Sequence, residues 1–99
     1  MTGKTFKLKS EIWLYGGESA WHFMTVDKKT TAKIRENFGR FSRGWSSLPV
    51  KVKLGRTVWT TSIFYDKQGV YLLPLKAAVR KKEGLVAGQT TPFAITILV

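Results

Sequence analysis

The last third of the chain, Val70–Ile97, contains the pattern that most restricts the fold. A short apolar strand leads into Leu73-Pro74, and Pro74 is expected in the first turn of a short basic helix, where its missing N–H is not needed. Gly84 is placed to end that helix in the left-handed conformation, which glycine adopts without steric cost. A tight turn and a second alternating strand follow. A unit of this kind excludes a helical bundle.

Period-two alternation of apolar residues predicts strands in the rest of the chain as well. Gly55-Arg56 is expected to join two of them in a type II′ turn, for which glycine supplies the positive φ. A second helix is predicted after Asp27, whose carboxylate can accept a hydrogen bond from the first turn, and Gly39–Ser47 is expected to be a loosely ordered loop. The predicted strands are 6–15, 20–26, 50–54, 57–65, 70–73 and about 92–99, and the predicted helices are 28–38 and 74–83.

These elements predict one mainly β domain over residues 1–99, a small β-barrel of about six strands with two short helices. Closure into a barrel is favoured because it removes exposed sheet edges. The face shared by Phe6, Leu8, Ile12 and Leu14 is expected to line the core. Two similar strand-into-helix junctions suggest an internal duplication of residues 5–48 and 49–99.

Two resemblances sharpen this fold. The spacing of Leu73, Pro74, Arg80, Gly84, Leu85 and Gly88 resembles the AbrB/MazE swapped-hairpin family of transcription regulators and antitoxins, although Gln89 stands where that family usually has an acidic residue. The segments EIWLYGGESAWHFMTV, GWSSLPVKVKLGRTVWTTSIF and YLLPLKAAVRKKEGLVAGQT resemble an uncharacterised bacterial family of unknown function, sometimes fused to a bacteriocin-protection-type domain. This second resemblance implies a double-split, AbrB-like barrel made by one chain, hence a monomer more than a swapped dimer, and implies no activity.

Composition narrows the chemistry. Lys and Arg total 17 against 6 acidic residues, a formal charge of +11, which would concentrate any polyanion near the protein. The absence of cysteine excludes disulfides, thiolate nucleophiles and cysteine zinc sites. No apolar run approaches the roughly 20 residues of a membrane span, and no secretory signal precedes the first strand. We therefore expect a cytoplasmic protein without a membrane role.

Catalysis is not expected. His22 is the only histidine, and Glu11 is the one carboxylate that a hairpin through Gly16-Gly17 would place across from it. A general base also needs a nucleophile within hydrogen-bond reach, and a metal site needs several clustered ligands. The sequence therefore predicts no enzyme, no catalytic residue, no cofactor and no metal.

Two basic patches are the candidate sites for a polyanion. Lys76, Arg80, Lys81 and Lys82 crowd the second helix, and Arg40, Arg43 and Trp45 lie with Phe41 in the predicted loop. Arginine pairs with phosphate through two hydrogen bonds, and aromatic rings stack on bases. The alternatives are that the helix cations only match the helix dipole, and that the loop aromatics fold back on the barrel.

A third class is a ligand cleft. Its candidate aromatic residues, which would otherwise fill the core, are Trp13, Trp21, Trp45, Trp59, Tyr71 and Phe93. Its candidate hydroxyl residues are Thr60, Thr61 and Ser62. The sequence thus predicts a small basic binding module that engages nucleic acid or another polyanion, with a small-molecule or protein-interaction domain as the alternative.

Overall fold

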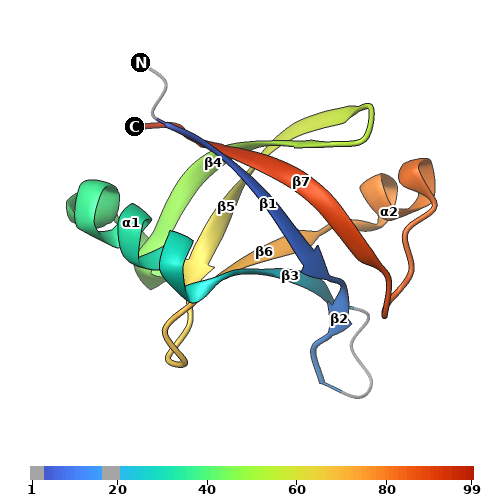
Figure 1. Cartoon of the computed structure of the whole chain (residues 1–99), viewed down its shortest axis with the longest axis horizontal. Coiled ribbons are helices and arrows are strands. Elements are labelled where there is room, and N and C mark those ends of the chain that lie inside the picture. Colours follow the sequence, from blue (N-terminus) through green and yellow to red (C-terminus); the bar gives the residue numbers. More distant parts are fainter. Residues whose placement is uncertain (1–3, 17–20) are drawn as a thin grey trace.

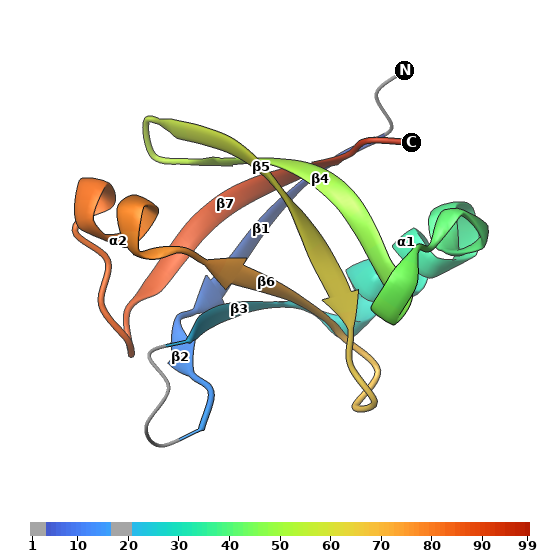
Figure 2. The ribbon, with the colours of Figure 1, turned by 180° about the vertical axis from the view of Figure 1, so that it is seen from behind.

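The computed structural model describes residues 4–16 and 21–99 and gives a mainly β fold with two α-helices (Figures 1 and 2). Seven strands form one antiparallel sheet in the order β1-β7-β4-β5-β6-β3-β2. The sheet curls into a half-barrel around the apolar core (Figure 1). The elements are β1 (Thr5–Glu11), β2 (Trp13–Leu14), β3 (His22–Val26), α1 (Lys28–Phe38), β4 (Ser47–Leu54), β5 (Thr57–Tyr65), β6 (Tyr71–Leu75), α2 (Ala77–Glu83) and β7 (Thr90–Ile97), with 3₁₀ turns η1 (Gly39–Phe41) and η2 (Gly44–Ser46) between α1 and β4.

The two edge strands of the sheet, β1 and β2, are consecutive in the chain. The single strand predicted at 6–15 breaks at Ile12, so seven strands form where about six were predicted. The main chain of Ile12 leaves the strand to pair with the turn before β7, donating to the carbonyl of Gln89 (2.9 Å) and accepting from the N–H of Gly88 (2.7 Å). The break also corrects the predicted face, because Leu14 is 51% exposed whereas Phe6 and Ile12 are buried.

Helix α1 begins where its sequence predicts, and Thr31 fastens it to the sheet. Asp27 caps it by accepting a hydrogen bond from the N–H of Thr30 (3.0 Å). Inside the first turn, the buried hydroxyl of Thr31 donates to the carbonyl of Val26 (3.1 Å) and accepts from the N–H of Tyr71 (3.2 Å). One threonine therefore joins the end of β3, the start of α1 and the start of β6.

Pro74 corrects the predicted start of the second helix. It lies within β6, and α2 begins only at Ala77. Pro74 has no N–H, so a sheet accepts it only where that donor faces an opening or an edge. The same missing donor suits the first turn of a helix, and the local sequence does not separate these two settings.

The end of α2 follows the predicted pattern. Gly84 adopts φ 67° and the buried side chain of Leu85 follows it. The last helical residue, Glu83, reaches back to the β4–β5 turn, where its Oε2 accepts from the hydroxyl of Thr57 (2.6 Å) and the N–H of Arg56 (3.3 Å). Gly55 in that turn has φ 59°, as the predicted type II′ turn requires. Helix α2 is thus attached to β5 at its far end.

The segment predicted as a loosely ordered loop, Gly39–Ser47, is instead built from two 3₁₀ turns. Arg43 and Ser47 close the second turn through hydrogen bonds between their main chains, of 2.8 and 3.3 Å. Trp45 and Ser46 inside it have positive φ, of 63° and 51°. Backbone hydrogen bonding thus orders a segment whose glycines and serines favoured irregular structure.

Candidate functional site

The two predicted basic patches lie at opposite ends of the molecule (Figure 1). One surrounds the turns between α1 and β4, and the other surrounds α2. A single compact ligand cannot touch both.

The first patch presents its tryptophan to solvent. Trp45 is 90% exposed, which contradicts the alternative that this ring folds back on the barrel. Phe41 is 43% exposed, and the guanidinium of Arg40 lies over its ring, 4.8 Å from the centroid. Arg43 is exposed beside them. The arrangement offers cations and an aromatic ring on a convex turn, without a cavity around Trp45 among those described.

The second patch divides into two pairs. Lys76 and Arg80 line a cavity of about 460 Å³ beside α2, whereas Lys81 and Lys82 are exposed on the same helix and are not among the residues that line it. Arg80 is held in place by a hydrogen bond from its Nε to the carbonyl of Leu75 (3.3 Å). Its terminal amino groups lie outside that bond, and they remain suited to a carboxylate or phosphate.

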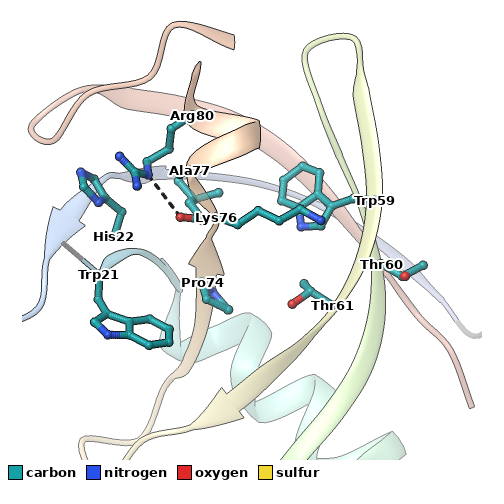
Figure 3. A pocket seen from close by; sticks show the side chains of 10 residues that line it. Trp21, His22, Trp59, Thr60, Thr61, Pro74, Lys76, Ala77 and Arg80 are labelled. Carbon is teal, nitrogen blue, oxygen red and sulfur yellow. Dashed lines mark hydrogen bonds between the residues drawn. The ribbon is translucent and has the colours of Figure 1, made fainter. Parts of the chain in front are cut away.

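The cavity draws its walls from four elements (Figure 3). The side chain of Lys76 extends from the start of α2 towards Trp59 of β5 (Figure 3). The residues that line the cavity are Trp21, His22, Trp59, Thr60, Thr61, Pro74, Leu75, Lys76, Ala77 and Arg80. The cavity therefore combines two cations, two indole rings and two threonine hydroxyls.

A second hollow, of about 560 Å³, continues the cavity along β5. It shares Trp21, Thr60, Thr61 and Pro74 with the first, and its wall extends to Phe64. We call the combined depression, from Lys76 and Arg80 at the α2 end to Phe64 at the other, the β5–β6 groove. An elongated shape distinguishes it from a closed pocket for a compact molecule.

The predicted cleft aromatics are divided by the structure. Trp21 is 59% exposed and stacks on Phe23, with 6.1 Å between ring centroids and 10° between ring planes. Trp59 is 8% exposed and lines the groove, whereas Tyr71 and Phe93 are buried in the core. Sequence reasoning named the rings and the hydroxyls, but it did not connect them with Lys76 and Arg80.

Glu11 is not the cross-strand neighbour of the histidine in the groove. His22 pairs with Leu14 of β2 and Leu75 of β6, while Glu11 pairs with Thr90 of β7. The register of β2 against β3 sets Leu14 opposite His22, so Glu11 would lie three residues too early in the chain to face it even without the break at Ile12. Within residues 4–16 and 21–99, no three His, Cys, Asp or Glu side chains gather closely enough to hold a metal ion.

The sequence did not predict the structural roles of two residues in or near the groove. Pro74 was assigned to the helix, and Glu83, which ties α2 to β5, was given no role. A proline inside an otherwise strand-like run was the available signal, since it marks an edge or an interruption of pairing. The Glu83 contacts join residues that are 26 and 27 positions apart, and no local sequence pattern predicts them.

Comparison with known proteins gives a family. A family described as a domain of unknown function (DUF1905) matches residues 9–95, a range that includes every residue of the first cavity. None of the curated proteins compared matches the chain. Of the helices described, none is long and apolar enough to cross a membrane.

Proposed function

We propose that this chain, which belongs to the DUF1905 family of domains of unknown function, is a binding module whose β5–β6 groove holds an anionic ligand with an apolar part. The observation that carries the proposal is the convergence of Lys76 and Arg80 with the indoles of Trp21 and Trp59 around one cavity. Such a site pairs an anion with the cations and covers the apolar part with the rings. The formal charge of +11 favours the encounter with an anion.

Binding, and not catalysis, is the proposed role. The hydroxyls of the groove belong to Thr60, Thr61 and Ser62, all on β5, and Glu11 belongs to the β1–β7 pair. A nucleophile needs a base and an orienting group in one hydrogen-bonded row. The threonines are better suited to donating hydrogen bonds to a ligand.

One NMR titration tests this proposal by following the indole N–H resonances of Trp13, Trp21, Trp45 and Trp59. The chain has four tryptophans, two that line the groove and two that do not. Phenylacetate and a ten-residue single-stranded oligothymidylate are the probes. We expect phenylacetate to shift the resonances of Trp21 and Trp59 and to leave Trp45 unmoved. A titration in which neither groove resonance moves with any anionic probe would refute the proposal.

A second candidate function is single-stranded nucleic-acid binding at the turn that carries Trp45. It is supported by the exposure of this ring, 90%, beside Arg40 and Arg43. Base stacking on an aromatic ring contributes about 1–3 kcal/mol, and phosphate contacts weaken steeply with salt. Oligothymidylate should then shift the Trp45 resonance at low salt and lose affinity at high salt. Substitution Trp45→Ala should raise its Kd about five- to a hundredfold.

The proposal also covers the type of barrel, the oligomeric state and the location of the protein. We propose an AbrB-like double-split barrel that one chain completes, in a cytoplasmic bacterial protein that is a monomer. The support is that the two edge strands of the sheet, β1 and β2, are consecutive in the chain and are joined at Ile12. Light scattering should give the mass of one chain, and twice that mass would favour a swapped dimer.

A further inference from the structure

The pairing of β5 with β6 stops almost as soon as it starts. The strands pair at Phe64–Leu72 and Tyr65–Tyr71, beside their common turn, and then diverge (Figure 2). Continuing the register would place Ser62 opposite Pro74. Proline has no N–H to give to a ladder, and this position coincides with the end of pairing. The divergence opens the β5–β6 groove.

The register also tells which main-chain groups of β5 face that groove. Asp66 and Val70 form the hydrogen-bonded pair that closes the turn, with Asp66 N–H donating to the Val70 carbonyl (2.8 Å). In an antiparallel ladder, hydrogen-bonded and non-hydrogen-bonded pairs alternate. Even-numbered residues of β5 therefore direct their N–H and C=O towards β6, and odd-numbered residues direct theirs towards β4.

The β4 side confirms this parity. The two-residue Gly55-Arg56 turn makes Leu54–Thr57 its closing hydrogen-bonded pair, so Thr57, an odd-numbered residue, faces β4. Val58, Thr60 and Ser62 then direct their main-chain donors and acceptors to the groove, and within residues 4–16 and 21–99 no strand pairs with them on that side, since β6 pairs with β5 only at residues 64 and 65. From Val58 to Ser62 is roughly 14 Å of extended chain.

We infer that the occupant of the β5–β6 groove is an extended, acidic peptide segment of a partner protein, which adds to the free edge of β5 as a strand. The inference rests on the proposed function and names its ligand class. Free strand edges recruit extended chains through main-chain hydrogen bonds, with alternate side chains read by neighbouring pockets. Thr60 and Ser62 supply the hydrogen-bonding edge, and the shared hollows supply the pockets.

Charge specifies the peptide as acidic. Lys76 and Arg80 lie at one end of the groove, and Lys51 is the direct partner of Thr60 on the neighbouring strand β4. Lys51 and Thr60 are both exposed, so they share the outer face of the sheet. A strand added beside Thr60 would place alternate side chains within reach of these cations, where carboxylates are favoured and lysines are not.

Hydrogen exchange of individual amides, measured by NMR on the full chain, tests the inference. The probe is a blocked hexapeptide of alternating valine and glutamate. In the free protein the amides of Thr60 and Ser62 should exchange fast, and those of Thr61 and Ile63, which pair with β4, slowly. Peptide at ten times its Kd leaves about one protein molecule in eleven free. Exchange at Thr60 and Ser62 should then slow about tenfold, with Thr61 and Ile63 unchanged.

The other outcomes each overturn the inference in a recognisable way. If the peptide shifts the indole of Trp21 but leaves exchange at Thr60 and Ser62 unchanged, strand addition is wrong while the proposed groove survives. If no anionic probe shifts Trp21 or Trp59, the proposed function itself fails. Slower exchange with rising protein concentration and no peptide would identify a second copy as the occupant. Protection by oligothymidylate, and not by the peptide, would identify nucleic acid.

A variant supplies an independent check on the same parity. Thr60→Pro removes an N–H that faces the groove and spares the ladder with β4, so the protein should fold and lose most of its affinity for the hexapeptide. Cooperative urea unfolding verifies the fold. A folded Thr60→Pro protein that binds the hexapeptide with unchanged Kd would contradict strand addition at this edge.

Discussion

The attachment of α2 to the β4–β5 turn can be measured through a glycine. A Cβ at Gly55 would fall on the carboxylate of Glu83, and the residue has φ 59°. Gly84 has a similar φ, 67°, and a Cβ added there would meet no heavy atom within 4 Å beyond its chain neighbours. Alanine at either position meets a penalty for positive φ of at least about 1–2 kcal/mol. Only alanine at Gly55 must also displace Glu83.

The extra cost follows from the hydrogen bonds that Glu83 would lose. Its Oε2 accepts from the hydroxyl of Thr57 (2.6 Å) and the N–H of Arg56 (3.3 Å). A bond to a charged group contributes about 1.5–3 kcal/mol, and the partial exposure of this one reduces that to about 1–2 kcal/mol. We therefore expect Gly55→Ala to lower the free energy of unfolding by about 2–4 kcal/mol, against about 1–2 kcal/mol for Gly84→Ala.

Urea denaturation of a double-mutant cycle isolates the contact. In a Glu83→Ala background the carboxylate is already gone, so the cost of Gly55→Ala should fall by the energy of the lost contact, whereas the cost of Gly84→Ala should stay the same. The coupling between positions 55 and 83 should be about 1–2 kcal/mol. If Gly55→Ala has the same effect with and without Glu83, the carboxylate does not hold α2 against β5, and the reasoning is refuted.

Three further predictions concern single residues. Asp27→Ala should lower the free energy of unfolding by about 0.5–2 kcal/mol at neutral pH. Partial burial alone would raise the pKa of Asp27, but hydrogen bonds from Thr30 outweigh it and lower that pKa below 3.8. The stabilisation is therefore present above the unfolded-state pKa and fades as pH falls through the lower folded-state pKa, so the urea-determined stabilities of the wild-type chain and Asp27→Asn should converge as the pH is lowered stepwise from neutrality. Tyr71→Phe should leave the melting temperature unchanged or raise it, because the Tyr71 hydroxyl is buried without a hydrogen-bond partner in the described chain; a large decrease would reveal a partner. Trp45→Gly should raise the free energy of unfolding by up to about 1 kcal/mol, because the residue has φ 63° and is 90% exposed; a clear loss would mean that the ring packs on the protein.

Local signals in the sequence predicted much of the fold. Alternation located β4 and β5, and the requirement for positive φ located the turn at Gly55 and the helix end at Gly84. The cap at Asp27 was also predicted, since it needs only a side chain three residues from a free N–H. Each of these features depends on only a few neighbouring residues, so a single sequence is enough to predict it.

The features that build the groove depend on distant parts of the chain. Pro74 satisfies the local rules for a helix start and for an open strand edge, and the pairing of β6 with β3, which sets Pro74 opposite Phe23, decides between them. Ile12 leaves its strand because Gly88 and Gln89 offer a pairing partner 76 and 77 residues away. Outside the groove, a tight turn closed by Arg43 and Ser47 holds Trp45 in solvent, which decides against the alternative that its ring folds back on the barrel. Such outcomes are set by tertiary pairing.

In the proposed binding mode, Lys76 and Arg80 hold the anion in the groove, and basic charge in general does not. Two double variants of α2 separate these explanations at equal net charge: Lys76→Gln with Arg80→Gln, and Lys81→Gln with Lys82→Gln. The decisive measurement is the Kd of the valine–glutamate hexapeptide for each, by titration calorimetry. The first variant should bind at least about tenfold more weakly than the wild-type chain, and the second about twofold at most. Equal losses in the two variants would contradict the account.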